Sequence, residues 1–285
     1  MSAIVPDALH FIDGSWVKGD PYILRAFDHA TWLMGGIFDG ARAFEGVTPD
    51  LELHCQRAVR SARNMGLASP LSAGEIQEIV VDGVGKFPSG TALYIRPFMW
   101  STAGWMQPDP ASTRIAISLT VTPMPEPKPF RVMLSRFRRP SPETAPTDAK
   151  AVCLYAQAGR AAGEAVAKGF DDGVMLDPMG NVAEFSAANL WIAKDGAAIT
   201  PAPNGTFLNG ITRQRLIKLF TAAGVPVQER SFGFQEVLDA DEVFSSGNFA
   251  KVVPVTGVED REKPIDGPIF SLARRLYWDF AHSKN

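Results

Sequence analysis

The chain has 285 residues, of which 46% are hydrophobic, 21% charged and 10% aromatic, an ordinary globular balance. A chain of this length can bury a sizeable core, in one large domain or in two smaller ones. The net charge of −3 argues against the basic surface that nucleic-acid binding requires. No stretch approaches the roughly 18 apolar residues of a membrane helix, and the N-terminal segment lacks the features of a secretory signal. We therefore expect a soluble cytoplasmic protein with neither nucleic-acid nor membrane partners.

The cysteines point in the same direction. Only Cys55 and Cys153 are present, which is too few for a disulfide framework, and their spacing is not that of metal ligands. A reducing compartment suits them, and no metal site is expected.

A proline-rich stretch divides the chain. Four prolines occur in the eight residues Thr122-Pro-Met-Pro-Glu-Pro-Lys-Pro129, and such a run fits neither a helix nor a central strand. Because prolines favour stiff, extended conformations, this stretch is typical of an interdomain linker. We predict a small domain over 1–123, a linker over 124–129 and a larger domain over 130–285.

The predicted small domain mixes strands and helices. Residues 10–17 read as two strands joined by a turn at Asp13-Gly14. Ser72 and Glu75 form a capping-box signature at a helix start. Helical periodicity predicts helices over 54–67 and 71–87, and the capping box belongs to the second of them. The β-branched and aromatic content predicts strands over 92–100 and 113–121.

The predicted larger domain starts with a strand over 130–137. An alanine-rich helix over 152–168 should end at Gly169, and a second helix over 212–223 should end at Gly224. The remaining patterns predict strands over 173–176, 182–193, 242–246 and 252–255, and a terminal amphipathic helix over 269–282. Because strands and helices do not alternate strictly, the fold class is α+β and not a doubly wound sheet.

Two segments have the features of an anion-binding site. Gly210-Ile-Thr-Arg213 precedes a helix, where free N–H groups and the helix dipole attract an anion. Gly247-Asn-Phe-Ala250 follows a strand, and successive turn amides can form an anion nest. An ordinary helix start and an ordinary turn are the alternatives for these two segments.

Three side chains add the chemistry of a carbonyl cofactor. Lys150 precedes an apolar helix, and a desolvated amine can form a Schiff base. Tyr155 could donate a hydrogen bond to a ring hydroxyl, unless it only packs in the core. Glu184 lies among neutral, mostly small residues and would need a cationic partner if buried, such as a protonated pyridine nitrogen; otherwise it is exposed. Together with the anion sites, these residues meet the requirements of pyridoxal 5′-phosphate (PLP).

The order and spacing of these motifs resemble the class IV aminotransferases of PLP fold type IV, and most of all the branched-chain amino acid aminotransferases. The resemblance covers nearly the whole chain from about His10 onward. It rests on Lys150 with Tyr155, on Glu184 with Asn189-Leu-Trp191, and on Gly210-Ile-Thr-Arg213. It implies a small α/β domain, a larger domain around a β-barrel, and a homodimer or higher homo-oligomer.

The resemblance also implies roles for the cofactor-binding residues. Lys150 takes the position of the catalytic lysine, which holds the cofactor covalently and transfers the proton. Glu184 matches the partner of the pyridine nitrogen, and Tyr155 matches the partner of the phenolic oxygen. The phosphate would contact Arg57, in the pattern His54-x-x-Arg57, together with Ile211, Thr212 and Asn248.

Substrate-binding roles follow from a second group of motifs. Tyr94-Ile-Arg96-Pro97 is typical of branched-chain aminotransferases, with Tyr94 facing the α-carboxylate and Arg96 receiving the side-chain carboxylate of glutamate or 2-oxoglutarate. Phe38 matches an aromatic wall of the pocket, and Phe249 lies on the turn that faces the substrate. The expected reaction is transamination between an L-amino acid with an apolar, branched side chain and a 2-oxo acid such as 2-oxoglutarate.

The chain departs from the branched-chain enzymes at four positions, one of which is Trp191, where phenylalanine or tyrosine is usual. Asn248 replaces a threonine, Phe249 a small residue, and Leu33 a tyrosine that helps to hold the distal carboxylate. Other activities on the same fold are therefore alternatives: a D-amino acid or (R)-amine transaminase, or a PLP lyase of the aminodeoxychorismate lyase type. A binding protein that has lost the cofactor is a third reading, and the intact set of Lys150, Glu184 and Arg57 argues against it.

Overall fold

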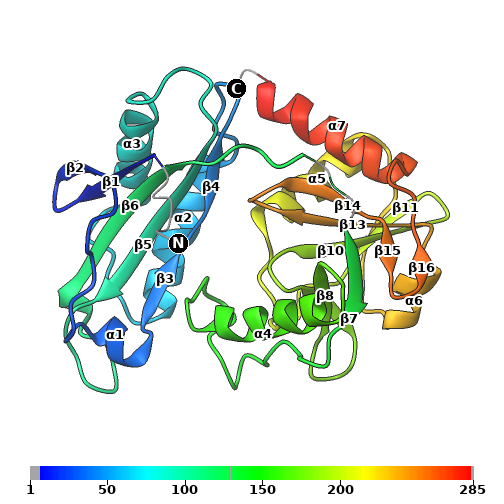
Figure 1. Cartoon of the computed structure of the whole chain (residues 1–285), viewed down its shortest axis with the longest axis horizontal. Coiled ribbons are helices and arrows are strands. Elements are labelled where there is room, and N and C mark those ends of the chain that lie inside the picture. Colours follow the sequence, from blue (N-terminus) through cyan, green and yellow to red (C-terminus); the bar gives the residue numbers. More distant parts are fainter. Residues whose placement is uncertain (1–6, 127, 129, 284–285) are drawn as a thin grey trace. The chain divides into compact units, whose positions relative to one another are not determined.

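Figure 1 shows a computed structural model of the chain, in which residues 7–126, 128 and 130–283 are described. The chain folds into two compact units. Unit 1 comprises Met1–Met124 with Asp148–Cys153, and unit 2 comprises Pro125–Thr147 with Leu154–Asn285. The observed mixture of helices and antiparallel and parallel strand pairs confirms the α+β class.

Unit 1 is built on a six-stranded antiparallel sheet in the order β2-β1-β6-β5-β3, with β4 also pairing with β5. The two long central strands, β5 and β6, lie in register from Leu93 opposite Val121 to Ser101 opposite Thr113. Its elements are β1 (Ala8–Ile12), β2 (Ser15–Lys18), α1 (His29–Leu33), β3 (Gly36–Phe38), β4 (Ala41–Ala43), α2 (Leu51–Asn64), α3 (Ala73–Val84), β5 (Leu93–Ser101), the 3₁₀ turn Pro110–Ser112 and β6 (Thr113–Val121).

Helices α2 and α3 cover one face of this sheet. Alternate residues of β5, such as Leu93 and Ile95, share a buried cluster with Cys55 and Ala58 of α2 and Ile76 of α3. Because successive residues of a strand point to opposite faces, the residues between them face away from these helices. That alternation decides which face of unit 1 carries Tyr94 and Arg96.

Unit 2 contains two five-stranded sheets, in the orders β12-β11-β10-β13-β14 and β16-β15-β7-β8-β9. Their elements are β7 (Arg131–Leu134), β8 (Asp172–Leu176), β9 (Val182–Phe185), β10 (Asn189–Lys194), β11 (Ala197–Thr200), β12 (Val227–Glu229), β13 (Glu242–Gly247), β14 (Lys251–Val255), β15 (Gly257–Val258) and β16 (Arg261–Glu262). Residues of both sheets, including Val132, Val174, Leu190 and Val243, belong to one hydrophobic core. Among the described residues no strand pairing joins the two sheets, so the closed barrel stays a prediction.

Four helices complete unit 2: α4 (Leu154–Ala167), α5 (Ile211–Ala222), α6 (Phe234–Asp239) and α7 (Pro268–His282). Leu190 and Ile192 of β10 point into the core, and Trp191 between them points to the other face. There its ring lies 5.8 Å from that of Phe220 on α5 and 5.8 Å from that of Phe244 on β13. Aromatic packing thus fixes α5 against the sheet, and with it the helix start that carries Ile211 and Thr212.

Most of the elements expected from the sequence are present. The turn at Asp13-Gly14 joins β1 to β2, and Ser72 with Glu75 forms the capping box of α3. The single strand expected over 182–193 is wrong, because the chain turns at 186–188 and forms two strands, β9 and β10. A one-dimensional apolar pattern does not distinguish one long strand from two short ones joined by small residues.

The predicted division into domains over 1–123 and 130–285 differs from the observed units in one segment. Asp148–Cys153 lies in unit 1, although it follows the proline-rich stretch in the sequence. Pro127 and Pro129 of the predicted linker lie outside the described residues. The assignment of functional domains stays a prediction.

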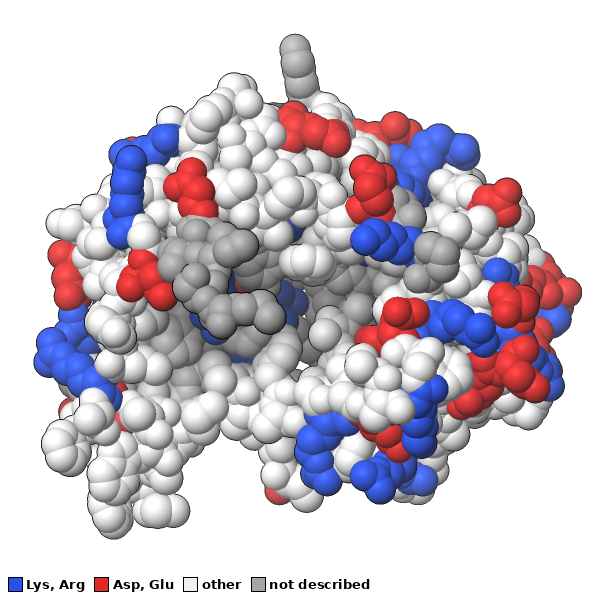
Figure 2. Space-filling view, in the orientation of Figure 1, with Lys and Arg blue, Asp and Glu red and all other residues white. Residues whose placement is uncertain are grey.

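Two surface properties complete the description. In the described part of the chain, no helix combines the length and the apolarity needed to cross a membrane. Figure 2 shows basic and acidic side chains interspersed on the face in view, in keeping with the net charge of −3.

Candidate active site

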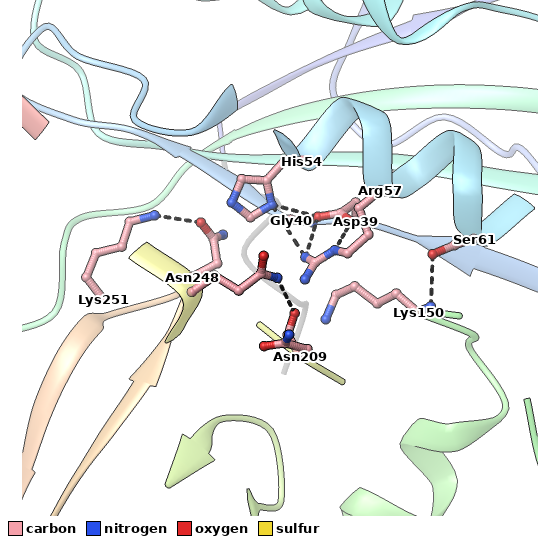
Figure 3. Close-up of polar contacts among 10 residues, drawn as sticks. Asp39, Gly40, His54, Arg57, Ser61, Lys150, Asn209, Asn248 and Lys251 are labelled. Atoms are coloured by element: carbon pink, nitrogen blue, oxygen red, sulfur yellow. Dashed lines mark hydrogen bonds and ion pairs between the residues drawn. The ribbon is translucent and has the colours of Figure 1, made fainter. Parts of the chain in front are cut away.

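The segment around Lys150 is fixed to the edge of unit 1 by backbone hydrogen bonds on both sides. The Phe38 N–H donates to the Lys150 carbonyl at 3.2 Å, and the Val152 N–H donates to the Gly36 carbonyl at 2.9 Å. The Lys150 N–H donates to the Ser61 hydroxyl of α2 at 3.1 Å (Figure 3). Segment 148–153 therefore lies antiparallel beside β3, with Ala151 opposite Ile37, and for this reason the lysine belongs to unit 1.

Phe38 forms a wall beside the lysine side chain. The Lys150 ammonium nitrogen lies 4.9 Å from the centroid of the Phe38 ring. An aromatic ring at this distance attracts the ammonium group and holds the side chain on one side. Because the backbone is anchored on either side of Lys150, its side chain projects from a rigid position.

A buried polar cluster lies next to this segment, directly after β3 and on α2. Asp39 is fully buried and accepts hydrogen bonds from Arg57 Nε at 2.6 Å and Arg57 Nη2 at 2.8 Å. His54 Nδ1 lies 2.8 Å from the same carboxylate, and Figure 3 shows Asp39 between the two side chains. Burial raises the pKa of Asp39, but the charge and hydrogen bonds of Arg57 and His54 outweigh it and hold that pKa well below its ordinary value.

This cluster holds Arg57 in place. Only 7% of its side chain is exposed, and two of its guanidinium nitrogens are engaged by one carboxylate. Bidentate pairing fixes the plane of a guanidinium group as well as its position. Arg57 was predicted from the family resemblance, whereas its partner Asp39 was not among the predicted site residues.

Three of the residues expected to bind substrate lie on the sheet face of unit 1 that α2 and α3 do not cover. Phe38 is opposite Phe98 in the β3–β5 register, and Arg96 precedes Phe98 by two residues on the same face. The Arg96 guanidinium carbon lies 4.8 Å from the centroid of the Phe38 ring and 5.3 Å from that of Phe98. Tyr94 lies further along this face, opposite Arg42 in the β4–β5 register. Unit 1 thus groups Phe38, Tyr94 and Arg96.

Leu33 lies apart from that group, at the end of α1. It lines a largely apolar cavity of about 290 Å³, and its side chain is partly exposed. The other residues that line the cavity are Phe27, His29, Trp32, Gly104, Trp105 and Met106.

Trp100 does not line this cavity. It is buried within unit 1, where its Nε1 donates to Asp28 at 3.1 Å.

In unit 2, Glu184 is buried and paired with a cation. Its Oε1 lies 3.2 Å from Nε of Arg139, and its side chain is only 9% exposed. The expectation that a buried Glu184 needs a cationic partner is therefore correct, and the reading of an exposed side chain is wrong. Arg139 was not among the predicted site residues. It precedes Glu184 by a long stretch of chain, and only the fold brings the two side chains together.

Asn189 connects Glu184 to the start of α5. Its Nδ2 donates to Glu184 Oε2 at 3.1 Å and to the Leu208 carbonyl at 2.9 Å, and its Oδ1 accepts from the Gly210 N–H at 3.2 Å. A Cβ at Gly210 would lie 2.1 Å from Asn189 Oδ1, so only glycine fits there. The two motifs that carry Glu184 and Gly210 therefore form one hydrogen-bonded structure.

Arg213 has a structural role in the same motif. It is fully buried, and its guanidinium group donates to Thr200 Oγ1, the Pro201 carbonyl, Asn209 Oδ1 and Glu229. These contacts tie the first turn of α5 to β11 and β12. Ile211 and Thr212 occupy the first two positions of this helix, where backbone N–H groups have no acceptor within the helix.

The turn that follows β13 holds the second anion-binding candidate. Oδ1 of Asn248 accepts a hydrogen bond from Lys251 Nζ at 2.7 Å (Figure 3). Asn248 Nδ2 is buried and has no hydrogen-bond partner within the described part of the chain. Phe249 on the same turn is 55% exposed.

Tyr155, the residue expected to contact the phenolic oxygen, lies in the first turn of α4 and is partly buried.

The donors and acceptors of unit 2 fit a phosphorylated pyridine. Asn248 Nδ2 and the first N–H groups of α5 are donors that suit phosphate oxygens. The carboxylate of Glu184 suits a protonated ring nitrogen. The residues assigned from the sequence therefore have the chemistry that PLP requires, and the roles of individual residues stay predictions.

Comparison with known proteins identifies relatives over nearly the whole chain. Residues 36–258 match the amino-transferase class IV family. The branched-chain-amino-acid aminotransferase of Pseudomonas aeruginosa is 30% identical, and the match covers 100% of this chain and 96% of that protein.

Solved structures agree with this result. An aminotransferase from Brucella abortus, determined with the cofactor PLP, has a TM-score of 0.96 and 46% identity, with 97% of this chain and 100% of that chain covered. The branched-chain amino acid aminotransferase of Escherichia coli has a TM-score of 0.87 and 27% identity, with 97% and 94% covered.

Proposed function

The chain belongs to the class IV aminotransferases, and we propose that it catalyses transamination between an amino acid and a 2-oxo acid with PLP as its cofactor. One observation in particular supports the proposal. Lys150 is the lysine that the family resemblance selects, and hydrogen bonds on both sides of it fix its backbone to the sheet edge, with its amine beside an aromatic wall. A lysine with only a surface role would not need such anchoring.

When bound, PLP supplies an aldehyde for the substrate amine and a ring that withdraws electrons from the substrate Cα. Lys150 Nζ would hold the cofactor covalently between turnovers, and as a base it would accept the proton that leaves the substrate Cα. The Phe38 ring and the hydrogen bonds on both sides of Lys150 limit the movement of this amine. The amine is therefore already positioned for each proton transfer.

Glu184 has the complementary role at the ring nitrogen. Its carboxylate favours a protonated nitrogen, and the hydrogen bond from Asn189 fixes the orientation of that carboxylate. Arg139 lies 3.2 Å from this carboxylate, and its positive charge partly offsets the cost of burying Glu184. Tyr155 would donate to the phenolic oxygen, while Arg57, Ile211, Thr212 and Asn248 would hold the phosphate.

The proposed substrates are an L-amino acid with an apolar, branched side chain and a dicarboxylic partner such as 2-oxoglutarate. Phe38 and Phe98 provide apolar surface, and the guanidinium group of Arg96 lies against both rings. Such a pocket accepts a branched side chain against the rings and a carboxylate against the guanidinium group. Tyr94 and Phe249 would face the α-carboxylate.

Leu33 and Phe249 favour a second candidate in the same class of chemistry. Both differ from the branched-chain enzymes at positions expected to face substrate, and both are exposed apolar side chains here. A D-amino acid or (R)-amine transaminase, or a lyase of the aminodeoxychorismate lyase type, is therefore the alternative.

A homodimer in the cytoplasm is part of the leading proposal.

An amino-donor panel tests the proposed function. The purified protein, loaded with PLP, is incubated with 2-oxoglutarate and with L-leucine, D-alanine or a simple (R)-amine, and keto-acid or ketone formation is measured. L-glutamate is tested separately with the 2-oxo acid of leucine as acceptor, and formation of leucine and 2-oxoglutarate is measured. We expect activity with the L-amino acids. Activity with only the D-amino acid or the amine would select the second candidate. Repeated turnover of aminodeoxychorismate to pyruvate without an amino acceptor would indicate a lyase. A protein that neither binds PLP nor reacts with any donor would contradict the proposal.

A further inference from the structure

Lys251 is the most deeply buried lysine near the proposed cofactor-binding residues, and neither the family motifs nor the proposed mechanism uses it. Only 1% of the residue is exposed. It is the first residue of β14, and its φ of 62° lies in the left-handed region that favours glycine or asparagine. A long charged side chain that is buried, and on a strained backbone, needs a specific reason.

The hydrogen bond from Lys251 determines the orientation of the Asn248 amide. An ammonium group has only donors, so it can pair with Asn248 Oδ1 and not with Nδ2. With Oδ1 held by Lys251 at 2.7 Å, the Nδ2 group must face the opposite side of the amide. There it is buried, and the described residues offer it no acceptor.

The lysine is itself held from the side of α7. Its Nζ lies 5.6 Å from the centroid of the Tyr277 ring, and Tyr277 is fully buried. A cation over an aromatic face is attracted to it. Lys251 therefore has little freedom to release Asn248, and the amide orientation is part of the folded structure of unit 2.

The position of Asn248 places it beside the start of α5. Asn248 follows β13, whose Ser246 is opposite Asn189 of β10 in the strand register. Asn189 in turn accepts from the Gly210 N–H immediately before α5. Asn248 Nδ2, which has no partner among the described residues, and the first N–H groups of α5 thus border the same corner of unit 2.

We propose that Lys251 is a positioning residue for the phosphate group of the cofactor: it fixes the Asn248 amide so that Nδ2 donates to a phosphate oxygen. The inference rests on the proposed function. It also explains how an asparagine can serve where the family resemblance leads us to expect a threonine, because a hydroxyl group rotates freely and an amide must be oriented.

The test compares ligands with and without the phosphate. The dissociation constants of PLP and of pyridoxal are measured on the apoprotein for the wild type, Lys251→Met, Asn248→Ala and the double variant. We expect Lys251→Met to weaken PLP binding about tenfold or more, as the loss of an oriented hydrogen bond to a charged group implies. Binding of pyridoxal should change less than about twofold, since pyridoxal has no phosphate oxygen to accept that bond.

The double variant separates action through Asn248 from direct action. If Lys251 acts by orienting the amide, the double variant should bind PLP no more weakly than Asn248→Ala alone. Lys251→Met should also lose its effect in an Asn248→Thr background. Fully additive losses would overturn the positioning role, and so would equal losses for PLP and pyridoxal accompanied by a lowered melting temperature. Lys218→Met, which removes an exposed lysine from α5, is the matched control and should bind PLP like the wild type.

A measurement with inorganic phosphate keeps this inference separate from the proposed function. Phosphate should raise the melting temperature of the wild-type apoprotein, and this rise should be lost in Lys251→Met and kept in Lys218→Met. An equal rise in all three proteins would overturn the role of Lys251, whatever the outcome of the amino-donor panel. Conversely, a phosphate effect that depends on Lys251 in a protein without transaminase activity would refute the proposed function alone.

Discussion

Asp39 and Arg57 form a bidentate ion pair inside unit 1, with Nε 2.6 Å and Nη2 2.8 Å from the two carboxylate oxygens. The carboxylate is fully buried and also lies 2.8 Å from His54 Nδ1. A carboxylate in this position stabilises the fold and fixes the guanidinium group expected to bind phosphate. One pair of residues thus links the stability of unit 1 to its proposed function.

Asp39→Asn should therefore lower stability in a manner that depends on pH. The folded-state pKa of Asp39 is held below its ordinary value of about 3.9, so its stabilising effect is complete above that pH and is lost as the pH falls below it. Near neutral pH the variant should lose about 3–5 kcal/mol, as for a broken buried pair. Urea unfolding at a series of pH values measures this, and the difference from wild type should shrink below about pH 4. A constant difference across pH would contradict the ionic role, and Asp82→Asn, at an exposed ion pair, is the control.

Lys150→Ala should abolish transamination, because the same amine holds the cofactor and transfers the proton. PLP should still bind without a covalent bond, through the residues that contact its phosphate. Mass spectrometry after borohydride reduction of the wild type should find the pyridoxyl group on Lys150. A label on Lys168 or Lys218 instead would show that the assignment of the lysine is wrong.

Glu184→Gln should reduce kcat far more than it reduces PLP occupancy. A neutral amide no longer favours protonation of the ring nitrogen, whereas the phosphate contacts are unchanged. The amide also leaves Arg139 without the carboxylate that lies 3.2 Å from its Nε. Steady-state kinetics together with the absorbance of bound PLP measure the two effects separately. Near-wild-type activity would mean that Glu184 only pairs with Arg139.

Arg96→Ala and Arg96→Met should raise KM for glutamate and 2-oxoglutarate more than for leucine. A charge-assisted hydrogen bond contributes about 1.5–3 kcal/mol, which corresponds to a selective loss of roughly 10- to 100-fold. The contacts of Arg96 with Phe38 and Phe98 offer a structural alternative, in which the guanidinium group only packs on the two rings. Equal losses for both substrate types with a lowered melting temperature would support that alternative.

Gly210→Ala should weaken PLP binding and lower stability for a steric reason alone. The backbone of Gly210, with φ of −63°, accepts alanine without strain, but the new Cβ would lie 2.1 Å from Asn189 Oδ1. Relieving such a contact costs about 1–3 kcal/mol and would displace Asn189 from Glu184. Thermal unfolding and PLP titration measure both effects. Gly159→Ala, in α4 where a Cβ meets no atom within 4 Å, should not weaken PLP binding.

Elements whose signals lie in neighbouring residues could be predicted from the sequence alone. The capping box at Ser72 and the helix ends at Gly169 and Gly224 depend on neighbouring residues only, and the structure confirms all three. The order of the motifs around Lys150, Glu184 and Gly210 was likewise enough to identify the family. Each of these motifs is contiguous, and so its pattern is visible without knowledge of the fold.

The side chains that contact those motifs could not be predicted from the sequence, because they reach the motifs only in the folded protein. Arg139 reaches Glu184, and Lys251 reaches Asn248 across a turn whose conformation no local pattern specified. Segment 148–153 joined unit 1 although it follows the proline-rich stretch, because hydrogen bonds to Gly36, Phe38 and Ser61 attach it there. Partners of this kind meet through strand pairing and packing between distant parts of the chain, and the burial that makes a charged residue need a partner exists only in the folded protein.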